Sequence, residues 1–174
     1  MAQHEGVSGL EDHLGYWLRR LSDEVHTTFE RRLSARGVTV SQWCVLVAVY
    51  HGATMTPLEV AHRLAIDSGA VTRLTDRLIA KGLLRREADL ADRRSVRLAL
   101  TDAGRDLVPD LAALADANDT AFFGVLAADE RRQFARLLVR LLAARGIEAT
   151  SRWQEGDAEG ATPEQRGARE GDET

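Results

Sequence analysis

The chain has 174 residues, 44% of them apolar, which is enough for one compact domain with or without a tail. No stretch approaches the roughly 18 consecutive apolar residues of a membrane span, the acidic N-terminus does not fit a secretory signal, and a single cysteine excludes an internal disulfide. We therefore expect a cytoplasmic protein without a membrane segment. The net charge of −4 does not exclude nucleic acid as a partner, because residues 57–105 carry ten basic against seven acidic residues and DNA responds to local charge.

The first predicted element is an amphipathic helix over residues 10–36, which Gly37 ends. Its apolar residues recur every three or four positions: Leu10, Leu14, Leu18, Leu21, Val25, Phe29 and Leu33. A second helix is predicted after Thr39, which forms the spacing of a capping box with Gln42, and it breaks at residues 51–53.

Two short helices are predicted next. Residues 56–59 read Thr-Pro-Leu-Glu, which combines a threonine cap, a proline at the first helical position and a glutamate three residues after the cap. The helix that follows is expected to bury Leu58, Ala61 and Leu64. After a tight turn, Asp67 is predicted to cap a helix over residues 68–81, which Gly82 ends. Its expected buried stripe is Val71, Leu74 and Leu78.

The periodicity then changes to that of strands. Residues 83–88 and 95–100 are short strand-like runs, and the second alternates apolar with other side chains. The segment between them is rich in aspartate and arginine. We interpret the three segments together as a β-hairpin with a charged loop over residues 89–94.

Two further helices and a tail complete the predicted elements. Thr101 is expected to cap a helix that Pro109 kinks. Its apolar residues are Leu107, Leu111, Leu114, Ala121, Phe122 and Val125. The final helix, residues 129–144, has Phe134, Leu137, Leu138, Leu141 and Leu142 on one face. Residues 146–174 hold eight acids and three arginines and hardly any apolar residue, which predicts a disordered acidic tail.

The predicted order is α-α-α-α-β-β-α-α, a mainly α fold with a small two-stranded β-wing. We divide it into an N-terminal dimerisation helix (10–36), a winged helix-turn-helix domain (39–100), C-terminal dimerisation helices (101–145) and the acidic tail (146–174). The terminal helices are assigned to a homodimer interface because they have no compact domain of their own to pack on. The tail is interpreted as a tether that competes with DNA for the basic face.

The helix over residues 68–81 is the predicted DNA-reading element. Arg73 and Arg77 lie four apart on its outer face, and three short polar residues are expected to point outward too: Ser68, Thr72 and Thr75. Ser68 and Thr72 are expected to contact DNA phosphates, and Arg73 is expected to form a bidentate contact with guanine in the major groove. Arg93 and Arg94, at the hairpin tip, suit the narrow minor groove. The alternative is that all these arginines are simply solvated surface.

Residues 56–104 resemble the multiple-antibiotic-resistance regulator (MarR) family. Five segments carry the likeness in family order and spacing: Leu58–Leu64, Val71–Leu78, Lys81–Arg86, Asp92–Arg94 and Leu100–Gly104. The resemblance, which extends over roughly residues 10–145, implies a homodimer with two reading helices about one DNA turn apart. It also implies binding to a pseudo-palindromic operator in double-stranded DNA, usually repression, and release by a small-molecule effector. By the same likeness Asp92 braces the wing and Arg94 enters the minor groove.

Members of the family often bind aromatic or phenolic acids between the dimer helices and the winged domain. By that likeness the candidate ligand-binding residues are His13, Tyr16, Trp17, Trp43 and Asp67. Members that respond to urate-like purines pair a tryptophan, an aspartate and a wing arginine, to which Trp17, Asp67 and Arg94 correspond. The alternative is that both tryptophans are core residues and that Asp67 is only a helix cap.

Other classes of function have weaker support. A redox-sensing regulator would use Cys44, but its apolar setting predicts an inert thiol with a raised pKa. The five histidines (His4, His13, His26, His51 and His62) contain no pair four apart and no cysteine partner, so we expect no metal site and no cofactor. No nucleophile–base set or phosphate-binding loop indicates an enzyme. A winged helix that binds only another protein remains the alternative to a DNA-binding regulator.

Overall fold

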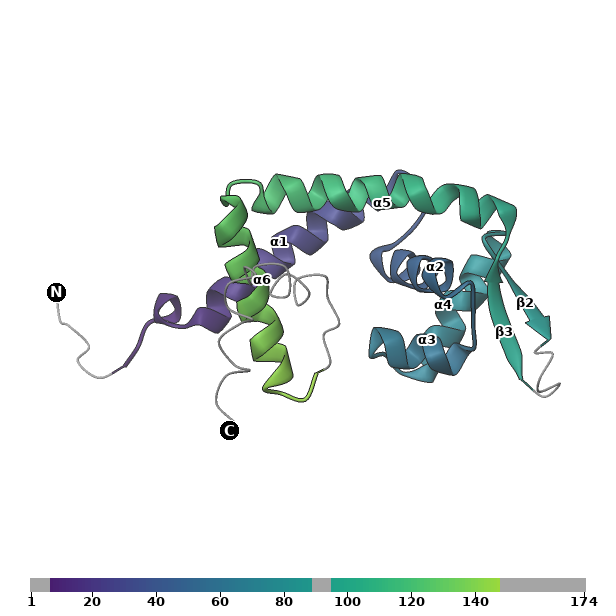
Figure 1. Cartoon of the computed structure of the whole chain (residues 1–174), viewed down its shortest axis with the longest axis horizontal. Helices are drawn as coiled ribbons and strands as arrows, with labels where there is room; N and C mark the ends of the chain where they lie inside the picture. The colour runs from purple at the N-terminus through teal and green to yellow at the C-terminus, as the bar shows by residue number, and fades with distance from the viewer. Residues whose placement is uncertain (1–6, 89–94, 148–174) are drawn as a thin grey trace, which may run out of the picture. The chain divides into compact units, whose positions relative to one another are not determined.

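The computed structural model describes residues 7–88 and 95–147, and the chain divides into two compact units, Met1–Phe122 and Phe123–Thr174 (Figure 1). The first contains η1 (Leu10–Asp12), α1 (Leu14–Ser34), α2 (Val40–Gly52), β1 (Thr54–Met55), α3 (Pro57–Leu64), α4 (Ser68–Ala80), β2 (Leu84–Ala88), β3 (Val96–Leu100) and α5 (Asp102–Phe123). The second contains α6 (Ala128–Ala143). The mainly helical fold with a β-wing is thus confirmed.

The first predicted helix is interrupted at its start. Leu10–Asp12 form a 3-10 turn, and the extended backbone of His13 separates it from α1. The predicted end is confirmed, because Gly37 adopts a left-handed φ of 69°, which costs a glycine little. The single helix predicted over residues 10–36 is therefore a short turn followed by a helix of 21 residues.

Side-chain caps fix the starts of the next three helices. The Thr39 hydroxyl accepts from Gln42 N at 3.2 Å, and the Thr56 hydroxyl accepts from Glu59 N at 3.2 Å. Asp67 Oδ1 accepts from Ala70 N at 2.8 Å. Each cap satisfies a backbone N–H that the first turn leaves without a partner. These three predicted caps are confirmed.

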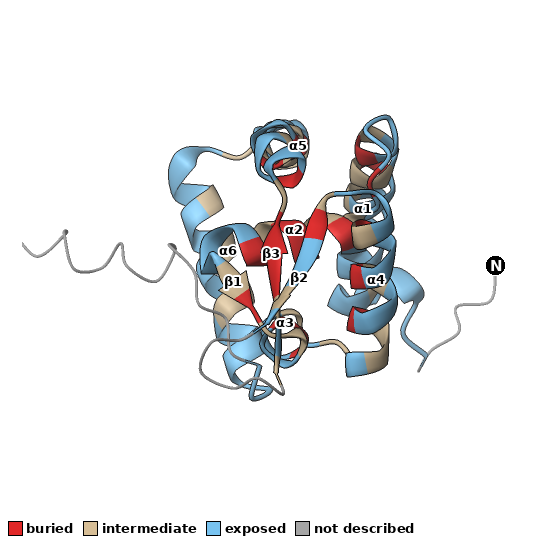
Figure 2. Cartoon of the chain, turned by 90° about the vertical axis from the view of Figure 1, so that its right-hand side faces the viewer, coloured by how far each residue is buried: buried red, intermediate tan, exposed pale blue. Residues whose placement is uncertain are grey.

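The hydrophobic core is centred on α2, which contacts α3, α4 and β3 (Figure 2). Its fully buried side chains include Leu33, Val45, Leu46, Val49, Val60, Val71, Leu78 and Leu98. The prediction for α3 was wrong at Leu58, whose side chain is 61% exposed, while Val60 is fully buried. Positions 60, 61 and 64 share one side of the helix, so Val60 takes the place in the core face that was assigned to Leu58.

The sheet has three strands in the order β1-β3-β2, all antiparallel. The β2–β3 hairpin begins one residue later in each strand than predicted, and its register pairs Leu84 with Leu100 and Ala88 with Val96. The wing prediction of two strands missed β1, which pairs Thr54 with Ala99. A two-residue strand carries no periodicity from which it could be recognised.

The last two helices differ slightly from the prediction. Thr101 caps α5, since its hydroxyl accepts from Gly104 N at 3.0 Å. That helix ends at Phe123, so Val125 falls outside it and is exposed. The kink predicted at Pro109 stays a prediction, and the tail predicted over residues 146–174 lies almost wholly outside the described residues.

Among residues 7–88 and 95–147, no single helix is long and apolar enough to cross a membrane. The helices α5 and α6 pass that test only when taken together, across the break between them.

Candidate nucleic-acid interface

Helix α4 is anchored by its inner face. Val71 and Leu78 are fully buried, and Leu74 is half-buried against the same core. The helix contacts both α2 and α3, with which it forms the three-helix part of the winged domain (Figure 1). The opposite face is therefore held in one orientation toward solvent.

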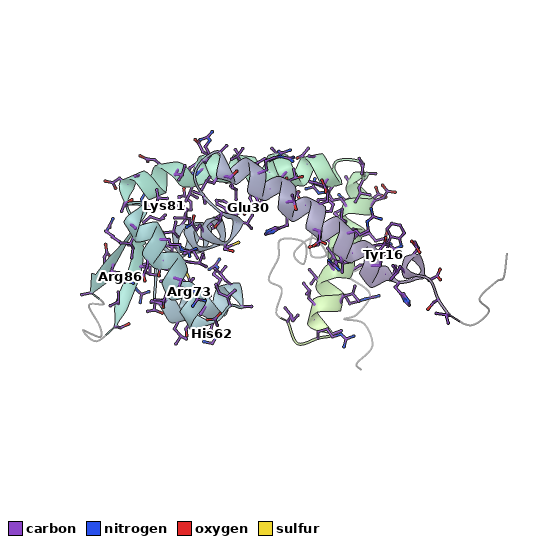
Figure 3. The ribbon with its side chains drawn as sticks, turned by 180° about the vertical axis from the view of Figure 1, so that it is seen from behind. Tyr16, Glu30, His62, Arg73, Lys81 and Arg86 are labelled. Atoms are coloured by element: carbon purple, nitrogen blue, oxygen red, sulfur yellow. The ribbon has the colours of Figure 1, made fainter. Side chains whose placement is uncertain are left out.

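Four of the predicted contact residues lie on that outer face. Ser68, Thr72, Arg73 and Arg77 are all exposed. Figure 3 shows Arg73 on α4, and within the described part of the chain neither Arg73 nor Arg77 forms an ion pair. The Thr72 hydroxyl donates to the Ser68 carbonyl at 2.9 Å, so its proton is already engaged within the helix. The two arginines offer their guanidinium groups to an external acceptor.

Thr75 does not share this face. Its side chain is only 1% exposed, and its hydroxyl donates to the Thr72 carbonyl at 3.0 Å. The prediction that Thr75 points outward was wrong because residue 75 lies beside Val71 and Leu78, four and three positions away, on the core side of the helix. We remove Thr75 from the contact set.

Three charged residues of this region form long-range contacts that the sequence analysis did not predict. Asp76 of α4 accepts a hydrogen bond from Arg86 of β2, with 2.6 Å between Oδ1 and Nη2. The Lys81 ammonium, just after α4, donates to the Gly37 carbonyl at 2.6 Å and to Gln42 Oε1 at 2.8 Å. These contacts join residues up to 44 positions apart, for which the sequence holds no local signal.

The base of the wing is tied to the rest of the domain through Arg97. Its Nε donates to Thr54 Oγ1 at 2.9 Å and its Nη2 to the Thr54 carbonyl at 3.1 Å. Its Nη2 also lies 3.6 Å from Glu59 Oε2, at the start of α3. The predicted minor-groove residues Arg93 and Arg94, with Asp92, lie outside the described residues.

The candidate ligand-binding residues fall into three places. His13, Tyr16 and Trp17 lie at the start of α1, where the two aromatic rings meet edge to face at 5.2 Å and the indole N–H donates to the Glu11 carbonyl at 2.8 Å. Trp43 is half-buried against the core, and Asp67 is the exposed cap of α4. Within the described ranges, no hydrogen bond or ion pair links one of these three places to another.

Cys44 is half-buried on α2. Burial raises the pKa of its thiol, and a backbone hydrogen bond opposes this less strongly. The expectation of a raised pKa is confirmed. In the described ranges, no three His, Cys, Asp or Glu side chains gather as a metal site would require.

The comparisons with known proteins agree with this geometry. A family model described as the MarR family matches residues 36–95. The multiple antibiotic resistance protein MarR of Escherichia coli is 33% identical over 91 residues, which are 52% of this chain and 63% of that protein, so the match spans less than two thirds of that relative. The HTH-type transcriptional repressor MdtR of Bacillus subtilis is 28% identical over 127 residues, 73% of this chain and 82% of the repressor.

Solved structures extend the likeness beyond the winged domain to the flanking helices. A mutant E. coli MarR in complex with operator DNA superposes with a TM-score of 0.69 at 29% identity, over 74% of this chain and 93% of that one. BpsR of Bordetella bronchiseptica gives a TM-score of 0.72 at 30% identity, over 78% and 97% of the two chains. CouR of Rhodococcus jostii bound to p-coumaroyl-CoA gives 0.71 at 28% identity, over 78% and 95%. With its winged domain, wing hairpin and flanking helices, the chain belongs to the MarR family of transcription regulators.

Proposed function

We propose that this protein is a sequence-specific DNA-binding regulator, a repressor in the cytoplasm, whose α4 enters the major groove. The observation that carries the proposal is the pair Arg73 and Arg77, exposed and free of ion pairs with any described residue, on a helix whose other face is buried. A helix fits the major groove, and an arginine fork matches the N7 and O6 acceptors of guanine. A similar fold is solved on operator DNA.

We propose further that the protein acts as a homodimer on a pseudo-palindromic operator. Large apolar side chains of α1 remain in contact with water in the single chain, and so do several on α6. They are Leu14, Leu18 and Leu21 on α1, and Leu137, Leu141 and Leu142 on α6. When a chain buries a hydrophobic core and still exposes several large apolar side chains on its helices, these side chains indicate a protein interface. In a two-fold dimer, two copies of α4 would read two half-sites.

The test is selection of bound duplexes from a random-sequence library, followed by footprinting at near-physiological salt with competitor DNA. We expect a protected pseudo-palindrome. Arg73→Ala should weaken binding to the selected duplex by roughly tenfold to a hundredfold and relax the preference at one position of each half-site. The control Arg31→Ala removes an exposed arginine from α1 and should bind as the wild type does.

No binding to any duplex at low salt would reject the DNA-binding proposal. It would favour the alternative of a winged domain that binds only another protein.

We propose that a small aromatic ligand releases the protein from DNA. Two similar proteins support this: BpsR, whose DNA binding is regulated by 6-hydroxynicotinic acid, and CouR, solved with p-coumaroyl-CoA. The aromatic pair Tyr16 and Trp17, with Arg20 stacked 5.6 Å and 6.0 Å from the two ring centres, offers flat surface and a positive charge to an aromatic acid.

The ligand proposal is tested with a panel of small aromatic acids added to the protein bound to the selected duplex. Trp17→Ala should keep the dimer and DNA affinity but lose the response to the active compound. An unchanged response would remove Trp17 from the ligand site.

A further inference from the structure

Asp76 is a feature of α4 that the proposed DNA contact does not explain. It is the only acidic residue in the helix, and it stands between Arg73 and Arg77 in the sequence. Its side chain is 54% exposed. A carboxylate near a groove lined by phosphates repels them, with an energy that grows as water is excluded from the interface. An unpaired Asp76 would therefore work against the two arginines beside it.

Arg86 reaches Asp76 from the wing. Successive side chains of a strand point to opposite faces, and on β2 the neighbouring Arg85 is directed to Glu87 and to the Leu100 carbonyl. Arg86 points the other way and donates to Asp76 Oδ1 at 2.6 Å. Figure 3 shows Arg86 on its strand and Arg73 on α4, in the same part of the domain. The charge of Asp76 is thus compensated by a residue from another element.

The geometry points to Arg86 as a positioning residue for DNA binding, and we propose that it neutralises Asp76 so that the outer face of α4 is net positive. The inference rests on the proposed function. With the pair formed, Arg73 and Arg77 are the uncompensated charges of this face. The same hydrogen bond ties β2 to α4, so the wing and the reading helix keep one relative orientation.

The pair is expected to act on DNA affinity and hardly on folding. Both side chains are about half exposed, at 49% and 54%, and exposed ion pairs contribute little to the free energy of unfolding. A neighbouring phosphate changes this, because bound DNA displaces water from the carboxylate. Unchanged thermal unfolding together with weakened DNA binding is therefore the signature that a merely structural role would not produce.

The experiment is a double-mutant cycle. Wild type, Arg86→Ala, Asp76→Asn and the double variant are titrated by fluorescence anisotropy against the duplex selected by the wild type and against an unrelated duplex. Arg86→Ala should weaken binding to both duplexes by about tenfold, as expected for one uncompensated charge near phosphate. Asp76→Asn should bind at least as tightly as the wild type. The double variant should return to within about twofold of the wild type.

The matched control is Arg85→Ala, which removes the same charge from the adjacent position of β2. It measures the general effect of one lost positive charge, and we expect it to be clearly smaller than that of Arg86→Ala. Equal effects would overturn the inference.

The remaining outcomes are equally decisive. If the double variant binds as weakly as Arg86→Ala, Arg86 acts by contacting DNA itself or by tying β2 to α4, and the masking role is wrong. If Arg86→Ala binds like the wild type, the inference fails while the proposed function stands. If the wild type binds no duplex, the proposed function fails and this inference fails with it.

Discussion

The winged region and the flanking helices α1 and α6 differ in how far their apolar side chains are buried. On α2 the side chains of Val45, Leu46 and Val49 are fully buried within one chain. On α1 the side chain of Leu14 is 87% exposed, and on α6 that of Leu141 is 61% exposed. The core of the winged region is therefore complete within one chain, with Leu33 of α1 and Leu111 of α5 buried in it. By contrast, α1 and α6 also carry apolar side chains that the single chain leaves in water.

This difference matches two separate physical tasks. A reading helix must hold its outer side chains in a fixed position, which requires a packed inner face and satisfied helix ends. A subunit interface requires apolar area that is free until a second copy covers it. Burial of each exposed large apolar side chain would contribute roughly 1.5–3 kcal/mol of free energy, which is the driving force available for the proposed dimer. Three predictions test this division.

The largest effect is expected from charges placed on the flanking helices. Leu14→Glu combined with Leu141→Glu would force two carboxylates into the proposed apolar interface, and we expect the dimer dissociation constant to rise by at least about a hundredfold. Sedimentation velocity over a concentration series measures this. The helical circular dichroism of the protein should persist.

The control for this substitution is Thr27→Glu, an exposed position of α1 on the side opposite to its apolar stripe, which should leave the dimer intact. A wild type that sediments as a monomer at all concentrations would refute the dimer proposal.

The second effect should arise where the start of α5 packs against the winged region. A Cβ on Gly104 would lie 2.1 Å from the Leu83 carbonyl oxygen, a backbone atom that other contacts hold in place. Gly104→Ala should therefore lower the free energy of unfolding by about 3 kcal/mol, measured by urea denaturation. The reverse change at the exposed neighbour, Ala103→Gly, should cost at most about 1 kcal/mol. Equal costs would show that the close approach of α5 to Leu83 is not rigid.

The smallest effect concerns Cys44 in the winged core. Because burial raises the pKa of its thiol, the folded state favours the protonated form. The associated stability is present below the ordinary thiol pKa and is lost as the pH rises through the folded-state pKa. We expect alkylation by iodoacetamide at neutral pH to be about tenfold slower in the folded than in the urea-unfolded protein.

Unfolding titrations in alkali check the same point. The stability of the wild type should fall more steeply with rising pH than that of Cys44→Ala. Parallel curves, or rapid alkylation of the folded protein, would favour the reading of Cys44 as a reactive thiol.

Local chemistry explains what could be predicted from the sequence. The caps at Thr39, Thr56 and Asp67 were correct because a cap is a contact between residues two or three apart, which the sequence displays directly. The stop at Gly37 was correct because a left-handed residue favours glycine wherever it occurs. Helix number, order and approximate bounds followed from periodicity in the same way.

The tertiary structure decided which side of each helix is buried and which side chains of different elements contact one another. Thr75 was assigned to the outer face and Leu58 to the core, and both assignments were wrong. The neighbouring elements that pack against a helix decide which of its side chains are buried, and the helix's own sequence pattern gives that side only approximately. The pairing of Asp76 with Arg86 joins a helix to a strand, and only the folded chain brings those residues together. The sequence by itself thus determined the elements and the family, since both depend on short-range spacing. The fold decided which charges of α4 are free to bind DNA, since that depends on contacts between distant residues.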